Sequence, residues 1–251
     1  MDQELAAMIA YFANEARESV VAEIPGYLAL RKITSLYHFT SAKNLESLVT
    51  NGFLGRTSLY DKNIDFTISD EHREEPILDG VCFSLSRPNI YMAAKKIREG
   101  KHDLVLLELN DVGAILSKHN FVAIPGNFGS PHLKALIKSW PEKFIGASGL
   151  INLFQNEAIR NKFSIPSFEP TDPQAEIIIL EPLQWIYVKK VYFPNSVDYL
   201  VSEKIREIMR RLPIGLVLHS QIKDVFPEID WSQSSISSEF NERKWKETWK
   251  A

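Results

Sequence analysis

One carboxylate interrupts an otherwise apolar run in the C-terminal half of the chain. The stretch is Thr171-Asp-Pro-Gln-Ala-Glu176-Ile-Ile-Ile-Leu180, where a turn-forming Asp-Pro pair precedes three isoleucines. This pattern is typical of a strand buried on both faces of a sheet. Because side chains alternate along a strand, Glu176 shares its face with Ile178 and Leu180. Glu176 is therefore either a strand-end residue that reaches water or a cleft residue that can take a proton or stabilise positive charge.

A second group of candidate residues lies where a strand meets a helix. Residues 36–40, Leu-Tyr-His-Phe-Thr, predict a strand with His38 and Thr40 on one face. Thr40 or Ser41 can cap the helix that follows, and Gly52 is its left-handed stop. The N–H groups at the start of such a helix suit a phosphate or the polar edge of an amide. A lone histidine on a strand is, however, more often a hydrogen-bonded core residue.

Residues 55–80 form a long polar segment that is rich in acidic side chains and carries Arg73 near its end. A loop of this length inside a compact domain is usually functional or disordered. Alternation over 81–86 predicts a strand directly after it. Residues 90–98 then predict a helix whose basic end is one local place for a phosphate backbone.

The remaining periodicities predict a mixture of helices and strands on both sides of these candidates. The tail after 231 differs, because it is serine-rich and carries Trp245 and Trp249 among cations. These tryptophans could stack on bases, although core packing is the more common role. The other expected elements are an amphipathic helix over 4–20 that ends before Pro25-Gly26, strands over 104–109, 121–124, 185–193 and 214–218, and helices over 133–140, 150–154 and 205–212.

The composition is that of an ordinary globular protein of 251 residues with 45% hydrophobic and 24% charged content. A formal net charge of −3 means that any polyanion site would be a local basic patch. The single cysteine, Cys82, excludes an internal disulfide and is a poor basis for a zinc site, so we expect no metal. The acidic N-terminus and the lack of a long apolar run favour a cytoplasmic protein without a membrane segment.

Four motifs in this order resemble the DarT-like family of nucleic-acid ADP-ribosyltransferases, over about residues 36–193. They are His38-Phe-Thr40…Asn44-Leu45…Gly52-Phe-Leu54, the acidic loop with Arg73, Gly80-Val-Cys-Phe-Ser-Leu-Ser-Arg-Pro-Asn89-Ile-Tyr-Met92, and Pro173-Gln-Ala-Glu176. The resemblance implies an α+β fold in which two facing, mostly antiparallel sheets form an ADP-ribosyltransferase core with flanking helices. We expect an N-terminal amphipathic helix in 1–30, this core in 31–200, and a C-terminal extension with a basic tail in 201–251.

The resemblance also implies NAD as co-substrate and a role for each matching residue. His38 and Thr40 would hold the ribose and amide on the nicotinamide side, and Asn44 would line the same pocket. Arg73 would be a catalytic residue over the pyrophosphate and the reacting ribose, although Arg56 and Arg87 are alternatives. Glu176 would be the catalytic carboxylate. This role agrees with its chemistry, because cleavage of the nicotinamide–ribose bond creates positive charge on the sugar.

The implied reaction places ADP-ribose on a base of single-stranded DNA, in a bacterial toxin or antiphage effector. The Pro-Asn-x-x-Met sequence after 87 is closer to the guanine-modifying branch of the family. The family further implies an antitoxin or an ADP-ribose hydrolase as partner. Three alternatives stay open: the same chemistry on RNA, transfer to protein or water, and a non-catalytic nucleic-acid or partner-binding module on the same fold.

Overall fold

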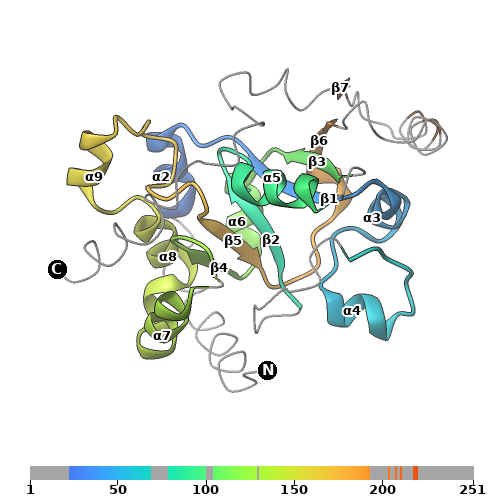
Figure 1. The fold of residues 1–251 in the computed structure, drawn as a ribbon, viewed down its shortest axis with the longest axis horizontal. Coiled ribbons are helices and arrows are strands. Elements are labelled where there is room, and N and C mark those ends of the chain that lie inside the picture. Colours follow the sequence, from blue (N-terminus) through green and yellow to red (C-terminus); the bar gives the residue numbers. More distant parts are fainter. Residues whose placement is uncertain are drawn as a thin grey trace.

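The computed structural model describes residues 23–68, 79–99, 104–128 and 130–192, together with Glu203, Glu207, Arg210 and residues 217–219. The described strands form one sheet in the order β4-β5-β2-β1-β3-β6-β7 (Figure 1). Neighbouring strands pair antiparallel, except for β6 and β7, which are parallel. The predicted α+β class with mostly antiparallel strands is confirmed. The strands are β1 (Leu36–Ser41), β2 (Val81–Leu85), β3 (Leu104–Leu109), β4 (Phe121–Ile124), β5 (Glu176–Ile179), β6 (Val188–Tyr192) and β7 (Val217–His219).

Short helices cover both faces of this sheet. Figure 1 shows α5 lying across β1 and β3, and α7 and α8 beside β4. On the other face α2 packs against α6, and α8 contributes Ala147 and Leu150 to the same apolar cluster. The described helices are α2 (Glu23–Arg31), α3 (Leu45–Asn51), α4 (Arg56–Asp61), α5 (Ile90–Arg98), α6 (Val112–Lys118), α7 (Pro131–Ser139), α8 (Gly146–Asn152) and α9 (Glu157–Lys162), with 3₁₀ turns η1 (Ala42–Asn44), η2 (Pro141–Phe144) and η3 (Trp185–Tyr187).

The strands divide into two groups that meet through a short contact between β1 and β2. Along β1, every residue from Leu36 to Ser41 has a register partner in β3. The described pairs between β1 and β2 are only Leu36–Leu85 and Tyr37–Ser84. The resemblance implied two facing sheets, whereas the structure joins β4-β5-β2 and β1-β3-β6-β7 into one hydrogen-bonded order at this point.

The two faces of the sheet are packed differently. One face carries a single large apolar cluster that includes Ile177 and Ile179 of β5, as well as residues of α2 and α6. The opposite face carries two separate clusters, one over β4 and β5 with α7, and one over β1, β3 and β6 with α5. Glu176 and the buried Ser84 belong to neither of these clusters. Alternation along β5 and β2 places Glu176 and Ser84 on this opposite face.

Several local predictions need correction. Pro25, expected beyond the end of a helix, lies in the first turn of α2, where a residue needs no N–H for an intrahelical bond. The polar segment 55–80 is not all loop, because α4 forms in its first half. Residues 185–187 form η3 instead of the start of a strand, and α6 and α9 were not predicted. The helix over 4–20 and the tryptophan tail lie outside the described residues.

Candidate active site

His38 lies at the level where β1 and β2 stop pairing. Its Nδ1 is 2.8 Å from the main-chain oxygen of Cys82 in β2. In a neutral imidazole this contact makes Nδ1 the donor and Nε2 the acceptor. The ring also packs against two phenylalanines of the core, with its centroid 5.4 Å from that of Phe53 and 5.3 Å from that of Phe83. His38 therefore has the geometry of a hydrogen-bonded sheet histidine, the alternative that the sequence left open.

Thr40, near the end of β1, and Asn44, in η1, form one hydrogen-bonded group. Asn44 Nδ2 donates to Thr40 Oγ1 at 3.0 Å and to the main-chain oxygen of Thr67 at 2.9 Å. Asn44 Oδ1 accepts from the main-chain N–H of Thr67 at 2.7 Å. The expected cap is Ser41, whose hydroxyl accepts from the N–H of Lys43 at 3.2 Å. Asn44 thus fixes Thr67 within the acidic segment 55–80, and its amide is engaged by the protein itself.

Glu176 is the first residue of β5 and pairs with Ile124 of β4. Its neighbours Ala175 and Ile177 both belong to the large apolar cluster. Alternation therefore directs the Glu176 side chain to the opposite face, where Ile178 also packs, as predicted. The residue is half-buried while the rest of the strand is fully buried.

The register separates Glu176 from the His38 group. β2 lies between their strands, and Phe83 of β2 pairs with Ile177. One step further along the same ladder, Glu176 comes beside Ser84. The side chain of His38 packs on Phe83 in the large cluster, on the face from which Glu176 points away. The structure therefore assembles His38, Thr40 and Asn44 together and holds Glu176 at a separate place on the sheet.

A tight turn at Asp172 precedes Glu176 and leads into β5. Asp172, which is buried, accepts from the N–H of Gln174 through Oδ1 at 2.6 Å. Its main-chain oxygen accepts from the N–H of Ala175 at 3.0 Å. These bonds are those of an Asx-type turn, the chemistry that the Asp-Pro pair predicts. The strand consequently starts at a defined residue.

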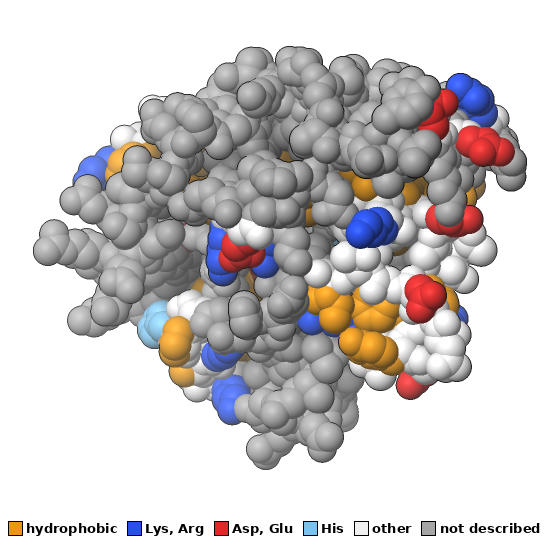
Figure 2. All heavy atoms as spheres, turned by 45° about the vertical axis from the view of Figure 1, so that its right-hand side comes forward, with side chains coloured by type: hydrophobic (Ala, Val, Ile, Leu, Met, Phe, Trp, Pro, Cys, Tyr) orange, Lys and Arg blue, Asp and Glu red, His pale blue; other side chains and the backbone are white. Residues whose placement is uncertain are grey.

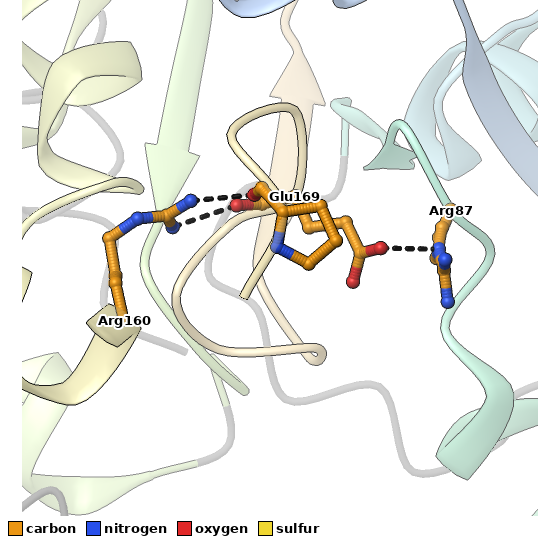
Figure 3. Close-up of polar contacts among 4 residues, drawn as sticks. Arg87, Arg160 and Glu169 are labelled. Carbon is orange, nitrogen blue, oxygen red and sulfur yellow. Dashed lines mark hydrogen bonds and ion pairs between the residues drawn. The ribbon is translucent and has the colours of Figure 1, made fainter. Parts of the chain in front are cut away.

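Two arginines hold the loop before this turn from opposite sides (Figure 3). Arg160 of α9 donates to the main-chain oxygens of Glu169 at 2.8 Å and Pro166 at 2.7 Å. Arg87, just after β2, pairs with the Glu169 carboxylate at 2.7 Å between Nε and Oε1. Arg87 also lies over the ring of Phe168, 6.0 Å from its centroid. The sequence had offered Arg87 for a phosphate, and the structure places it on this loop.

Arg73 and Arg56 are the other arginines predicted for the pyrophosphate. Arg73 lies outside the described residues, so its place over a pyrophosphate stays a prediction. Arg56 is the first residue of α4. Figure 2 shows acidic, basic and apolar side chains interspersed among the described residues of the face that carries α3 and α4. On that visible, described part, basic side chains do not gather into one patch.

A buried carboxylate that sequence reasoning missed lies in β3. Glu108 is 6% exposed and accepts from the hydroxyl of Ser35 at 3.1 Å and from the hydroxyl of Tyr192. Lys190 Nζ lies 3.6 Å from its Oε2. Burial, followed by the charge of Glu108, raises the pKa of Tyr37 to about 12. One glutamate in the apolar run Leu-Val-Leu-Leu-Glu-Leu was the available signal, the same signal that singled out Glu176.

The described part of the chain shows neither a metal-binding group nor a membrane-spanning helix. Among its His, Cys, Asp and Glu side chains, no group of three or more could hold a metal ion. None of its helices has the length and apolarity to cross a membrane.

No family model and no curated protein matches the chain. Among solved structures it is similar to Thermosipho africanus DarTG in complex with ADP-ribose, with a TM-score of 0.46, 14% identity, and coverage of 73% of this chain and 49% of that one. The chain thus spans about half the length of that protein. It is also similar to Thermus sp. 2.9 DarT in complex with carba-NAD⁺, with a TM-score of 0.46, 15% identity, and coverage of 74% and 95%. The same DarT in complex with ADP-ribosylated single-stranded DNA gives a TM-score of 0.44, 15% identity, and coverage of 75% and 94%.

Proposed function

We propose that this chain is an NAD-dependent ADP-ribosyltransferase that places ADP-ribose on a base of single-stranded DNA and releases nicotinamide. The observation that carries the proposal is Glu176, a half-buried carboxylate at the start of a fully buried strand, delivered there by the Asp172 turn. A carboxylate beside apolar side chains costs free energy to desolvate, so a chemical role is a good reason for its presence at this position. The four sequence motifs supply the reaction class.

In this proposal Glu176 stabilises the positive charge that develops on the ribose as the bond to nicotinamide breaks. It also takes the proton from the attacking base nitrogen. Arg73 binds the pyrophosphate through its planar fork of N–H groups. No metal is needed in these steps.

The residues near the end of β1 have two kinds of role. His38 and Thr40 would contact the nicotinamide side of NAD where β1 and β2 stop pairing, because a ligand between the separating strands can reach them and Glu176 from opposite faces of the sheet. Asn44 was expected in the same pocket, but its contacts with Thr40 and Thr67 favour a supporting role. We therefore assign to Asn44 the task of holding residues 64–68 next to the pocket.

The biological setting follows the same proposal. A base-modifying enzyme would act in the cytoplasm as a toxin or antiphage effector, and an antitoxin or ADP-ribose hydrolase would be its partner. The Pro88-Asn89-x-x-Met92 motif favours guanine as the acceptor base, as in the guanine-modifying branch of the family. A flipped or unpaired base is required, because the reacting nitrogen is not accessible in a stacked duplex.

The test is incubation of the purified chain with adenine-labelled NAD and, separately, single-stranded DNA, duplex DNA, RNA or a protein mixture. Glu176→Gln removes the charge while keeping the side-chain shape, and Glu142→Gln is the matched control at an exposed glutamate. We expect label on single-stranded DNA with the parent and Glu142→Gln chains. With Glu176→Gln we expect a loss of ~10²-fold or more.

Each other outcome points to one of the alternatives. Label on RNA or protein alone changes the acceptor and keeps the chemistry. Nicotinamide release without transfer indicates hydrolysis of NAD. Equal labelling by the parent and Glu176→Gln rejects the catalytic role of Glu176. DNA affinity without any turnover favours the binding module.

A further inference from the structure

Arg160 is a buried arginine whose three side-chain hydrogen bonds all go to one loop, while its guanidinium also lies 5.5 Å from the centroid of the Phe154 ring. The residue is 5% exposed and lies in α9. Besides the main-chain oxygens of Pro166 and Glu169, its guanidinium donates to Thr171 Oγ1 at 3.2 Å. A buried guanidinium is costly unless its N–H groups are satisfied, so the loop and the arginine stabilise one another. Figure 3 shows the guanidinium directed into the loop.

The far end of the same loop is fixed to the body of the protein. The N–H of Thr171 donates to the main-chain oxygen of Leu153 at 2.8 Å. Its hydroxyl donates to the main-chain oxygen of Gln155 at 2.6 Å. Thr171 therefore accepts from Arg160 and donates to the segment after α8. These bonds fix the position of residue 171 relative to α8 and α9.

The segment from Thr171 to Glu176 is short and is held by hydrogen bonds. Asp172 bonds both Gln174 and Ala175, and Glu176 then enters the ladder with β4. A displacement of Thr171 is therefore transmitted along a hydrogen-bonded turn to the carboxylate. Small displacements matter, because a misplacement of ~1 Å can cost ~10²-fold in rate.

We propose that Arg160 is a positioning residue that sets the place of Glu176 through residues 166–171. It does so without contact with the reacting atoms. Its planar fork of N–H groups reaches three acceptors at fixed angles, which the single ammonium of a lysine cannot do. The catalytic part of this inference rests on the proposed function. The structural part, control of the loop and turn by Arg160, does not.

Arg160→Lys is the main test, because it keeps the positive charge and removes the fork. Thr171→Val is the second variant, since it removes the shared hydroxyl with little change of volume. Arg210→Lys is the matched control at an exposed arginine outside the loop. The measurements are kcat and KM for ADP-ribose transfer, and amide hydrogen exchange of residues 163–176 and of strand β3.

We expect kcat to fall at least ~10-fold in both variants while KM for NAD changes less than ~3-fold. Exchange in 163–176 should accelerate while exchange in β3 stays at the parent rate. A purely structural role would accelerate exchange in β3 as well and lower the amount of folded protein at unchanged kcat per folded molecule. That result, or unchanged exchange in 163–176, overturns the inference.

The two proposals fail separately. If the parent chain transfers no ADP-ribose under any condition, the proposed function is rejected. Amide hydrogen exchange then tests the structural part of the inference, which is control of the loop and turn by Arg160. Faster exchange that extends from the Arg160 contacts to Glu176 supports control of the turn, and equal exchange in parent and variants rejects it.

Discussion

The side-chain amide of Asn44 and the main chain of Thr67 form two hydrogen bonds, in the same pattern that joins neighbouring β-strands. The amide oxygen of Asn44 accepts from the Thr67 N–H at 2.7 Å, and the amide nitrogen donates to the Thr67 oxygen at 2.9 Å. The partners lie 23 residues apart in the chain. A single side chain thereby attaches the start of the acidic loop to the end of β1.

Asn44→Ala should lower the free energy of unfolding by about 1–3 kcal/mol, since it leaves both main-chain groups of Thr67 without this partner. Chemical denaturation measures the change. Asn51→Ala is the control, because the Asn51 side chain is exposed and bonds within its own helix. The control should change stability by less than about 0.5 kcal/mol. Similar values for the two variants would show that the Thr67 contacts contribute little.

Gly55→Ala should be strongly destabilising. A Cβ at Gly55 would lie 2.1 Å from the main-chain oxygen of Asp79, which cannot move as a flexible side chain would. Gly26→Ala is the matched control, because nothing lies within 4 Å of its Cβ position in α2. We expect a loss of about 2 kcal/mol or more at Gly55 and a gain of about 0.5–1 kcal/mol at Gly26. A neutral Gly55→Ala would mean that Asp79 does not pack against this glycine in solution.

The Arg87–Glu169 ion pair should contribute less than the contacts of Arg160. Its side chains are 37% and 20% exposed, so water screens their attraction. A double-mutant cycle with Arg87→Gln and Glu169→Gln should give a coupling of about 0.5–1 kcal/mol that declines with added salt. Coupling that is absent at low salt, or that does not depend on salt, would contradict this interpretation.

Glu108 and the two tyrosines whose pKa it raises, Tyr37 and Tyr192, predict a loss of stability at alkaline pH. The folded chain binds the phenol proton of Tyr37 more tightly than the unfolded chain, because its pKa is raised from 10.0 to about 12. Stability from this group is therefore complete below pH 10 and declines as the pH rises towards 12. Burial and the hydrogen bond to Glu108 also raise the pKa of Tyr192.

Ultraviolet titration of tyrosinate alongside unfolding measurements tests this prediction. Tyr37→Phe should remove one late-ionising group and flatten the decline. Glu108→Gln should lower the pKa of Tyr37, because the carboxylate charge is its second cause after burial. A parent chain whose tyrosines all ionise near the ordinary value while it is folded would contradict the buried cluster.

Local patterns in the sequence were sufficient for the strands and for the turn before Glu176. The strands at 36, 81, 104, 121 and 176 follow from apolar runs and alternation, which depend on neighbouring residues alone. The Asp172 turn follows from side-chain bonding to the nearby main chain. The identity of Glu176 and His38 as candidates came from the same local patterns.

Tertiary structure decided what these residues contact. The order of strands places β2 between Glu176 and His38, and alternation directs their side chains to different faces. The amide of Asn44 is engaged by Thr67, and Arg87 is engaged by Glu169, although both looked available for a ligand in the sequence. Arg160 showed no signal, because two of its three hydrogen-bond partners are main-chain oxygens, and every residue type offers one. Contacts of that kind depend on where the chain returns in space, which no local pattern of side chains encodes.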